Sequence, residues 1–407
     1  MSKVVGIIAE YNPFHNGHIY HIQSTKEKTG ADFVIAIMTG NFTQRGSTSV
    51  VNKWEKTKMA LNGGVDLVIE LPTVYSISSA ENFASGAIKI LDKLGIAHTI
   101  SFGMEASDIS DLNNIANVLY SEPQEYKDIL KYELKKGESY PKARENALMV
   151  YLNDIKRYGG ILKGSNNILS IEYLKALKKY KSNIIPVGIK REKVYYNSTK
   201  IIDEYASATG IRSLLLRNQI EEIRKVVPGT TFNILLNNLR EGSAVLDLTA
   251  FGSEIIYKLR TMTLKEIANL PDVSEGLENL IKETANKTNN LIELINGIKS
   301  KRYTQTRLQR ILLCALLGIT KKDVELSKKI VPYVRVLGCS DNGKMLLSQI
   351  NNKVKVITSV KKFENVNKNK KLTRLLEIDK RATNIYTLAY KRNSKANLDY
   401  TKGLILQ

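Results

Sequence analysis

The chain has 407 residues, more than one hydrophobic core usually supports, and its 43% hydrophobic and 25% charged residues are typical of a globular protein with two or three domains. A membrane-spanning helix is not expected because no run of about 18 apolar residues occurs, and the short first apolar run, which ends at Glu10, is unlike a secretory signal. The net charge of +21 favours a polyanionic partner, and two cysteines without metal-ligand spacing, Cys314 and Cys339, indicate a protein of the reducing cytoplasm.

The first predicted element is a buried strand at residues 4–8, a run rich in β-branched side chains that Asn12-Pro13 ends. The turn that follows holds three of the four histidines of the chain, His15, His18 and His21. The first two flank Gly17 as His-x-Gly-His at the start of a predicted helix, whose open N–H groups favour an anion. We therefore predict a nucleotide-phosphate site here, in preference to surface histidines in an ordinary turn.

Strands and helices then alternate along the first half of the chain. Further strands are expected at residues 32–38, 66–72, 99–103 and 184–189, with helices between them. Continuous apolar strands that alternate with helices predict an α/β domain with a Rossmann-like parallel sheet covered on both faces. Ligands of such sheets bind at the carboxyl ends of the strands. Four segments directly follow predicted strands, so we expect them on the same side of the sheet: the histidine turn, the polar loop 39–47, Gly103 and the pair Lys190-Arg191. The basic pair either contacts phosphate or is simply solvated.

Two polar motifs lie between the predicted strands and the second half of the chain. Asn166 and Asn167 open a predicted helix, where their amides either contact a nucleotide or cap the helix. Ser207-x-Thr209-x-Ile211-Arg212 opens another, and its hydroxyls, N–H groups and arginine suit the outer phosphates of a nucleotide. An ordinary N-cap is the alternative, but the order after a His-x-Gly-His turn favours the phosphate site.

Beyond residue 227 the β–α alternation ends, and we predict a catalytic domain at 1–227 and a mainly α-helical, basic domain at 228–407. From Lys299 to the end, 25 basic residues face 7 acidic ones, a net +18, whereas the first 298 residues carry +3. This asymmetry predicts that the second domain binds a nucleic acid, because a generally lysine-rich composition would spread the excess. The basic side chains around Tyr303 suit contacts with RNA phosphates, and the tyrosine suits stacking on an unpaired RNA base. Alternatively, these side chains form a solvated helix face.

Taken together, these motifs resemble the tRNA(Met) cytidine acetate ligases, a family of the nucleotidylyltransferase superfamily. The matching segments are residues 6–20, 44–46, 53–55, 63–72, 83–87, 102–103, 166–169, 206–212 and 302–310. Asn12 stands where many nucleotidylyltransferases carry an aspartate, which fits this narrower family. Class I aminoacyl-tRNA synthetases share the histidine turn, but their lysine-rich second signature is absent.

The resemblance implies that ATP and acetate form acetyl-adenylate, which acetylates the wobble cytidine of elongator tRNA(Met) at N4. Magnesium would arrive with the triphosphate, with no DNA or membrane partner and no metal-binding residue of the protein. The implied catalytic residues are His15 and His18. The implied ATP-binding residues are Ile8, Ala9, Glu10, Tyr11, Asn12, Pro13, Phe14, Asn16, Gly17, Ile19, Tyr20, His21, Gly103, Asn166, Asn167, Lys190, Arg191, Thr209 and Arg212. Loop position makes Gln44, Arg45 and Lys53 the candidates for the acetate pocket. The implied tRNA-binding residues are Lys301, Arg302, Tyr303, Arg307 and Arg310.

Two other functions remain compatible with parts of the sequence. A nucleotidylyltransferase that joins AMP to a small phosphorylated metabolite would share the motifs but would not need the basic region. A non-catalytic RNA-binding protein would need the basic region but not the intact histidine turn and Thr209–Arg212 signature.

Overall fold

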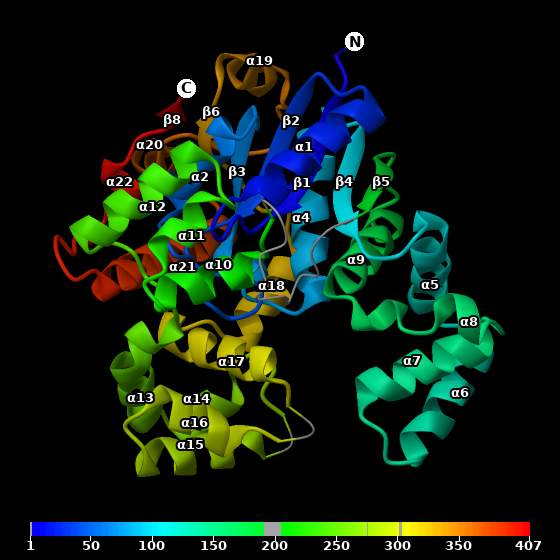
Figure 1. Cartoon of the computed structure of the whole chain (residues 1–407). Coiled ribbons are helices and arrows are strands. Elements are labelled where there is room, and N and C mark those ends of the chain that lie inside the picture. Colours follow the sequence, from blue (N-terminus) through cyan, green and yellow to red (C-terminus); the bar gives the residue numbers. More distant parts are fainter. Residues whose placement is uncertain (1, 191–204, 275, 301–302) are drawn as a thin grey trace.

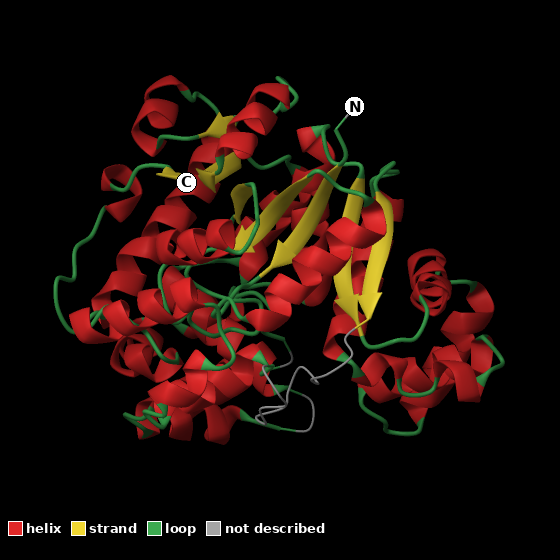
Figure 2. Ribbon diagram, turned by 45° about the horizontal axis from the view of Figure 1, so that its top comes forward, coloured by secondary structure: helices red, strands yellow, loops and turns green. Residues whose placement is uncertain are grey.

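The computed structural model describes residues 2–190, 205–274, 276–300 and 303–407. Within these ranges one eight-stranded sheet runs through the molecule in the order β5-β4-β1-β2-β3-β6-β7, with β8 paired to β6. The strands are β1 Val4–Ala9, β2 Phe33–Thr39, β3 Leu67–Leu71, β4 Thr99–Met104, β5 Ile185–Lys190, β6 Val334–Cys339, β7 Val356–Ile357 and β8 Ile405–Leu406. Figure 1 follows the chain through this sheet, and Figure 2 shows the strands surrounded by helices.

The first five strands are parallel to their neighbours, which confirms the predicted α/β sheet. The chain adds β2 and β3 on one side of β1 and then returns to add β4 and β5 on the other side. The strand order therefore reverses between β1 and β4, and such a switch point opens a crevice at the carboxyl ends of the strands. The histidine turn follows β1 at this crevice.

Helices cover both faces of the sheet because neighbouring strand residues point to opposite sides. In β1, Val4 packs with the core around helices α4 and α9, whereas Val5 and Ile7 pack with the core around α1, α2 and α10–α12. These helices span α1 Asn16–Thr29, α2 Lys53–Asn62, α4 Ala80–Leu94, α9 Ser165–Lys179, α10 Ala208–Leu216, α11 Ile220–Arg224 and α12 Gly229–Glu241. No helix in the described ranges has the length and apolarity needed to cross a bilayer.

Two further groups of helices lie apart from the sheet in Figure 1. One follows β4 and contains α5 Ile109–Ser121, α6 Gln124–Lys135, α7 Tyr140–Tyr151 and α8 Ile155–Tyr158. The other contains α13 Gly252–Thr261, α14 Leu264–Ala268, α15 Leu277–Lys287, α16 Leu291–Ile298 and α17 Gln305–Leu317. Helix α18, Lys321–Lys329, then leads back towards the sheet.

The last part of the chain completes the sheet. Strand β6 pairs antiparallel with β3, and β7 and β8 pair with β6. Between them lie α19 Asp341–Gln349, α20 Val360–Val366, α21 Lys370–Tyr386 and α22 Leu398–Thr401. The sequence did not predict β6 or β8. The mainly helical character predicted for 228–407 is confirmed, but the sheet continues through β6, β7 and β8, so residue 227 is not a boundary of the sheet.

Four buried charged side chains join the end of the chain to β3. Lys53 pairs with Glu70 at 2.9 Å and with Asp399 at 2.7 Å, and Arg335 pairs with the same two carboxylates at 3.3 and 2.6 Å. All four residues are buried. Because removal of one partner would leave an uncompensated buried charge, this cluster fixes the C-terminal segment against the parallel strands.

Candidate functional site

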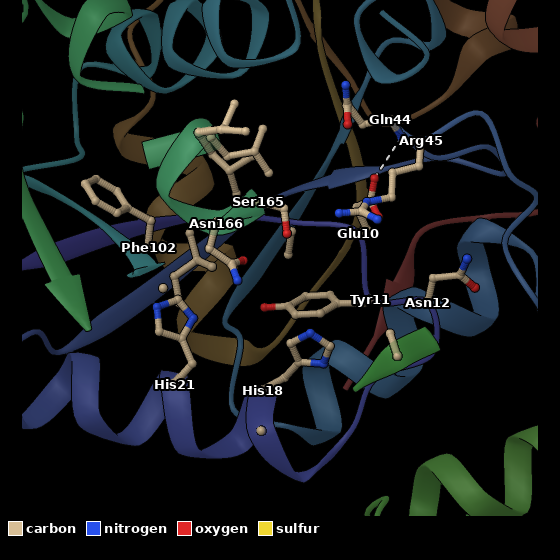
Figure 3. Close-up of a pocket in the computed structure, with 18 of the residues that line it drawn as sticks. Glu10, Tyr11, Asn12, His18, His21, Gln44, Arg45, Phe102, Ser165 and Asn166 are labelled. Atoms are coloured by element: carbon tan, nitrogen blue, oxygen red, sulfur yellow. Dashed lines mark hydrogen bonds between the residues drawn. The ribbon is translucent and has the colours of Figure 1, made fainter. Parts of the chain in front are cut away.

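A cavity of about 510 Å³ opens at the carboxyl ends of β1 and β4. Its walls come from the turn after β1, the start of α1, the loop after β2, the start of α4, the end of β4, the start of α9, the end of β5 and α17. Figure 3 shows side chains from several of these elements pointing towards one another. The cavity therefore unites both halves of the chain.

The turn after β1 is shaped by Tyr11 and Asn12. Tyr11 adopts a left-handed backbone conformation, with φ of 47°, and its buried ring lies edge-on to His18, with 4.8 Å between the ring centroids. Asn12 uses both ends of its amide: Nδ2 donates to the carbonyl oxygen of Thr48 at 2.8 Å, and Oδ1 accepts from the N–H of Val50 at 2.7 Å. An aspartate cannot donate the first of these bonds, so the asparagine fixes the turn against the 48–50 segment.

His15 and His18 stack on one another at the N-terminus of α1, with ring centroids 3.7 Å apart. The N–H of His15 donates to Nδ1 of His18 at 3.1 Å. Because Nδ1 accepts this bond, the proton of the neutral ring lies on Nε2, and this nitrogen is a hydrogen-bond donor. A Cβ atom at Gly17 would lie 3.0 Å from the His15 ring, so glycine is the residue that lets this ring sit against the helix.

His21 lies one turn further along α1 and contacts β4. Its Nε2 lies 3.1 Å from Oγ of Ser101, and that hydroxyl lies 2.6 Å from Oγ1 of Thr25. The ring lines the cavity near Phe102 (Figure 3). This arrangement orients His21 by hydrogen bonds below the cavity, on the β4 side of the histidine turn.

The start of α9 reaches the cavity through Asn166, while Asn167 has a structural role. Oδ1 of Asn167 accepts from the N–H groups of Glu105 and Ala106 at 2.8 and 3.0 Å, and its Nδ2 donates to the carbonyl oxygen of Ile161. The Glu105 carboxylate in turn accepts from the main-chain N–H groups of Asn166 and Asn167. The sequence left two roles open for these asparagines, contact with a nucleotide or capping of the helix. In the structure Asn166 lines the cavity, whereas Asn167 fixes the loop after β4.

The second signature joins the first at the turn after β1. Ser207 caps α10 by accepting from the N–H of Gly210 at 3.0 Å. Arg212 donates from Nη2 to Oγ1 of Thr209 at 3.1 Å and from Nη1 to the carbonyl oxygen of Asn12 at 2.8 Å. Two motifs that are 200 residues apart in sequence thus share a hydrogen bond. The second signature therefore lies against the histidine turn in the folded protein.

A buried lysine supports the floor of the cavity. Nζ of Lys56 donates to the carbonyl oxygens of Glu10 and Thr39, both at 2.8 Å, and so ties the end of β1 to the end of β2. Burial lowers the pKa of Lys56 to about 7, against the opposing effects of the Glu10 and Glu70 carboxylates. Nζ also donates to Oγ1 of Thr39 at 3.1 Å, so this buried lysine makes three hydrogen bonds at the ends of the two strands.

The loop after β2 packs against α17. The N–H of Gln44 donates to Oε1 of Glu10 at 2.8 Å, and its Nε2 donates to the carbonyl oxygen of Ser78 at 3.0 Å. Gly46 has a φ of +76°, and a Cβ atom there would lie 2.7 Å from the backbone nitrogen of Arg310. This close contact holds Gln44 and Arg45 beside α17. The side chains of Gln44, Arg45 and Arg310 all line the cavity.

Most of the residues implied by the sequence line the cavity or support its wall. The lining residues among them are Ile8, Ala9, Glu10, Tyr11, Asn12, His15, Gly17, His18, Tyr20, His21, Gln44, Arg45, Gly103, Asn166 and Lys190. Those not in the wall are Pro13, Phe14, Asn16, Ile19, Asn167, Thr209 and Arg212. Arg191, Lys301 and Arg302 lie outside the described residues.

The structure does not bring every candidate to the site. Lys53 is fully buried in the ionic cluster with Glu70 and Asp399, which excludes it from the cavity and from an acetate pocket. Tyr303 is 9% exposed and lies under the guanidinium of Arg307, 4.8 Å from its ring centroid, so it is not a free stacking surface. Sequence spacing could not foresee either burial, because both depend on contacts with distant segments.

Arginines 307 and 310 both bind Asp272, from the segment before α15. Arg307 donates to the carbonyl oxygen of Asp272 from Nε at 3.1 Å and from Nη2 at 2.6 Å. Arg310 pairs with the Asp272 carboxylate at 3.3 Å and also lines the cavity. The structure therefore places Arg310, predicted as a tRNA contact, in the wall of the site itself.

Several site residues were not predicted from the sequence. They are Glu105, Phe102, Ser165, Ser79 and Thr306. Each is a common residue type without a distinctive neighbour pattern, except that Phe102 precedes Gly103 at a strand end. Only the position of Phe102 at the carboxyl end of a predicted strand offered a usable signal.

This arrangement is suited to an anionic, nucleotide-sized ligand. The N-terminus of α1, the Nε2 donor of His18 and the second signature all lie near the turn after β1, where they would stabilise phosphate charge. Within the described ranges, no group of three or more His, Cys, Asp or Glu side chains is arranged to hold a metal ion.

Comparison with known proteins gives consistent matches over the whole chain. The family model described as HIGH Nucleotidyl Transferase matches residues 2–401. A tRNA(Met) cytidine acetate ligase of Thermoanaerobacter sp. is 46% identical over 406 residues, with 99% of both chains covered, and one of Acetivibrio thermocellus is 43% identical, covering 99% of this chain and 100% of the relative.

Two solved structures carry the same fold. The apo form of Thermotoga maritima TmcAL has a TM-score of 0.95 and 34% identity, with 99% of each chain covered. The same protein bound with alpha-thio ATP has a TM-score of 0.92 and 33% identity, again with 99% of each chain covered.

Proposed function

The chain belongs to the tRNA(Met) cytidine acetate ligase family of HIGH nucleotidyl transferases, and we propose that it uses ATP to join acetate to a cytidine of tRNA(Met). The reaction has two steps. Acetate first attacks the α-phosphate of ATP to give acetyl-adenylate and pyrophosphate. The N4 amine of the wobble cytidine of elongator tRNA(Met) then attacks the acetyl carbon and releases AMP, leaving N4-acetylcytidine.

The first step needs stabilisation of charge on the α-phosphate. The fixed Nε2 donor of His18 and the N-terminus of α1 supply it, and His15 supports His18 by stacking and by the bond from its main-chain N–H. Tyr11 holds the His18 ring from the side. No side-chain nucleophile is required, because acetate is the nucleophile and the protein supplies position and charge.

The nucleotide fits the cavity with its phosphates at the histidine turn and its adenosine towards β4, α9 and β5. Asn166, Gly103 and Lys190 line that side. The second signature supports the outer phosphates through Arg212 and Thr209. Magnesium bound to the triphosphate would lower the charge repulsion met by the incoming acetate.

Binding of tRNA is assigned to the second half of the chain, whose residues from Lys299 onwards carry a net charge of +18. Part of this charge is neutralised internally, as the Arg335 and Arg310 pairs show, so the exposed lysines contribute most of the attraction to phosphate. We propose that residues 1–227 bind ATP and that residues 228–407 supply most of the surface that binds tRNA.

The observation that carries this proposal is the bond from Arg212 to the carbonyl oxygen of Asn12, which links the second signature to the turn after β1 that lines the cavity. The test is incubation of the protein with ATP, magnesium, labelled acetate and tRNA. Label in tRNA supports the ligase, whereas pyrophosphate release only with another small molecule favours metabolite adenylylation. Absence of any ATP turnover would leave an RNA-binding protein.

A matched variant sharpens this test. His18→Ala removes the Nε2 donor and is expected to lower acetate-dependent ATP–pyrophosphate exchange by roughly 100- to 1,000-fold, the usual effect of one lost transition-state donor. Its tRNA affinity should stay within about twofold of the wild-type value, because phosphate contacts dominate that affinity. Equal loss of both activities would contradict the division of labour.

A further inference from the structure

The cavity extends beyond the crevice expected for the nucleotide. The switch point lies between β1 and β4, but part of the wall lies on the opposite side of β1. This part, here termed the β2 end, is formed by Glu10, Gln44, Arg45, Ser79, Thr306 and Arg310. In Figure 3, Glu10, Gln44 and Arg45 lie together, with Tyr11 and His18 between them and the group of Phe102, His21 and Asn166.

Glu10 presents a carboxylate at the β2 end. Its backbone oxygen is fixed by Lys56, and its Oε1 accepts from the N–H of Gln44, so both the main chain and the side chain are oriented. Gln44 is itself held by the carbonyl oxygen of Ser78. Among the described residues no donor contacts Oε2 of Glu10, so this oxygen can accept a hydrogen bond from a ligand.

Arg310 presents donors to the same end of the cavity. The Asp272 carboxylate accepts from its Nε at 3.4 Å and from its Nη2 at 3.3 Å, and only 12% of the side chain is exposed. The contact of Gly46 with the backbone of Arg310 fixes the distance between the loop after β2 and α17. The β2 end therefore combines an oriented acceptor with an oriented donor.

This pairing of charges matches the polar edge of cytosine. Cytosine offers the N4 amine as a donor and N3 and O2 as acceptors, and a carboxylate suits the amine while an arginine suits the acceptors. Uracil would instead place its O4 acceptor against the carboxylate. We propose that the β2 end is the acceptor-base subsite, in which Glu10 binds the N4 amine of the target cytidine and accepts its proton.

The proposal rests on the function proposed above and adds a base to its second step. The N4 lone pair forms the bond to the acetyl carbon, and the bond from that carbon to the adenylate oxygen breaks, so AMP leaves with the electron pair. The proton lost by N4 passes to the Glu10 carboxylate and then to solvent. Atoms and charge balance without any further reactant.

The test separates acetyl transfer from adenylate formation. Glu10→Gln keeps an oxygen that can accept from Gln44 but cannot take a proton. Enzyme preloaded with labelled acetyl-adenylate is mixed with tRNA in a single turnover, and acetate-dependent ATP–pyrophosphate exchange is measured in parallel. We expect transfer to fall roughly 100-fold or more, the usual contribution of a general base, and exchange to fall far less. Glu10→Asp should recover part of the transfer rate, and the melting temperature of each variant reports folding.

Arg310→Met provides a second readout, with Arg374→Met as its matched control. Arg374 also pairs with an aspartate, Asp323, from Nε at 2.7 Å, but it does not line the cavity. We expect Arg310→Met to reduce the preference for cytidine over uridine in competition for binding by at least about tenfold, from the loss of one base-edge contact, with no change in Arg374→Met.

The outcomes are distinct from a failure of the proposed function. Unimpaired transfer by Glu10→Gln, or equal losses in transfer and exchange, would overturn the subsite while the wild-type protein still labels tRNA. An unchanged base preference in Arg310→Met would overturn the role of the arginine. If the wild-type protein does not label tRNA, the proposed function fails instead.

Discussion

Asn12→Asp probes the asparagine that fixes the turn after β1 against the 48–50 segment. The asparagine is 2% exposed, and both ends of its amide are bonded. An aspartate keeps the bond from Val50 but loses the bond to the carbonyl oxygen of Thr48, leaving a buried acceptor unpaired at a cost of about 1–3 kcal/mol. Burial of the new charge adds to this cost, and the nearby Arg212 guanidinium offsets part of it.

The pH dependence follows from the same contact. A protonated carboxyl group can donate to Thr48, so folding favours the protonated form and raises the pKa of the introduced aspartate above its unfolded value of about 3.9. Stability relative to the wild-type protein is therefore lost as pH rises through the folded-state pKa. We expect a deficit of about 3 kcal/mol at pH 8 that becomes smaller at pH 5.

Urea unfolding followed by fluorescence measures this deficit, because Trp54, the one tryptophan of the chain, is buried at the start of α2, close in sequence to Val50. Asn12→Ala is the control, since it also loses the bond to Thr48 but introduces no titratable group. A deficit of Asn12→Asp that is absent at pH 8, or equal at pH 5 and pH 8, would refute the assigned role of the amide.

Three further predictions follow from the contacts around the cavity. Burial lowers the pKa of Lys56 from 10.5 to about 7, so the unfolded chain binds more protons than the folded protein between these two pH values. Stability should therefore rise with pH across that window by at most about 1.4 kcal/mol per pH unit. Lys56→Met should lose this pH dependence in urea titrations, and a retained dependence would assign it to another group. Gly46→Ala should lower stability by about 1–2 kcal/mol, because residue 46 has a φ of +76° and lies against the backbone of Arg310. It should also slow acetyl transfer more than adenylate formation. An equal slowing of both steps would contradict this prediction. The affinity for tRNA should fall steeply with salt, and Arg307→Glu should flatten this slope in filter-binding assays; an unchanged slope would place the RNA surface away from α17.

Much of the parallel sheet could be predicted from local sequence. Strands β1 to β4 are mostly apolar runs, and each is followed by glycine, proline or polar residues, so their limits and the common side of their carboxyl ends were expected. The histidine turn was expected because the His-x-Gly-His spacing, the preceding strand and the following helix all occur within 20 residues. Local propensity and a short motif are enough for such features.

Strand β6 was missed because its local sequence is ambiguous. Val334–Cys339 contains an arginine and a glycine in six residues, and the arginine is neutralised only by Glu70 and Asp399 in the folded protein. The same cluster buries Lys53, which the sequence placed in a loop facing acetate. A charged residue in a strand or core is acceptable only when distant partners meet it, and no local pattern reveals those partners.

The sequence by itself determined the parallel strands, the histidine turn, the second signature and the basic character of the last quarter. These are properties of neighbouring residues: periodicity, turn residues and charge. Tertiary structure alone decided that Arg212 binds Asn12, that Asn167 supports the wall while Asn166 faces the cavity, and that Arg310 joins Glu10 at the β2 end. Each depends on contacts between segments far apart in the chain, because hydrogen bonds and buried charges are satisfied by whichever partner the fold brings within a few ångströms.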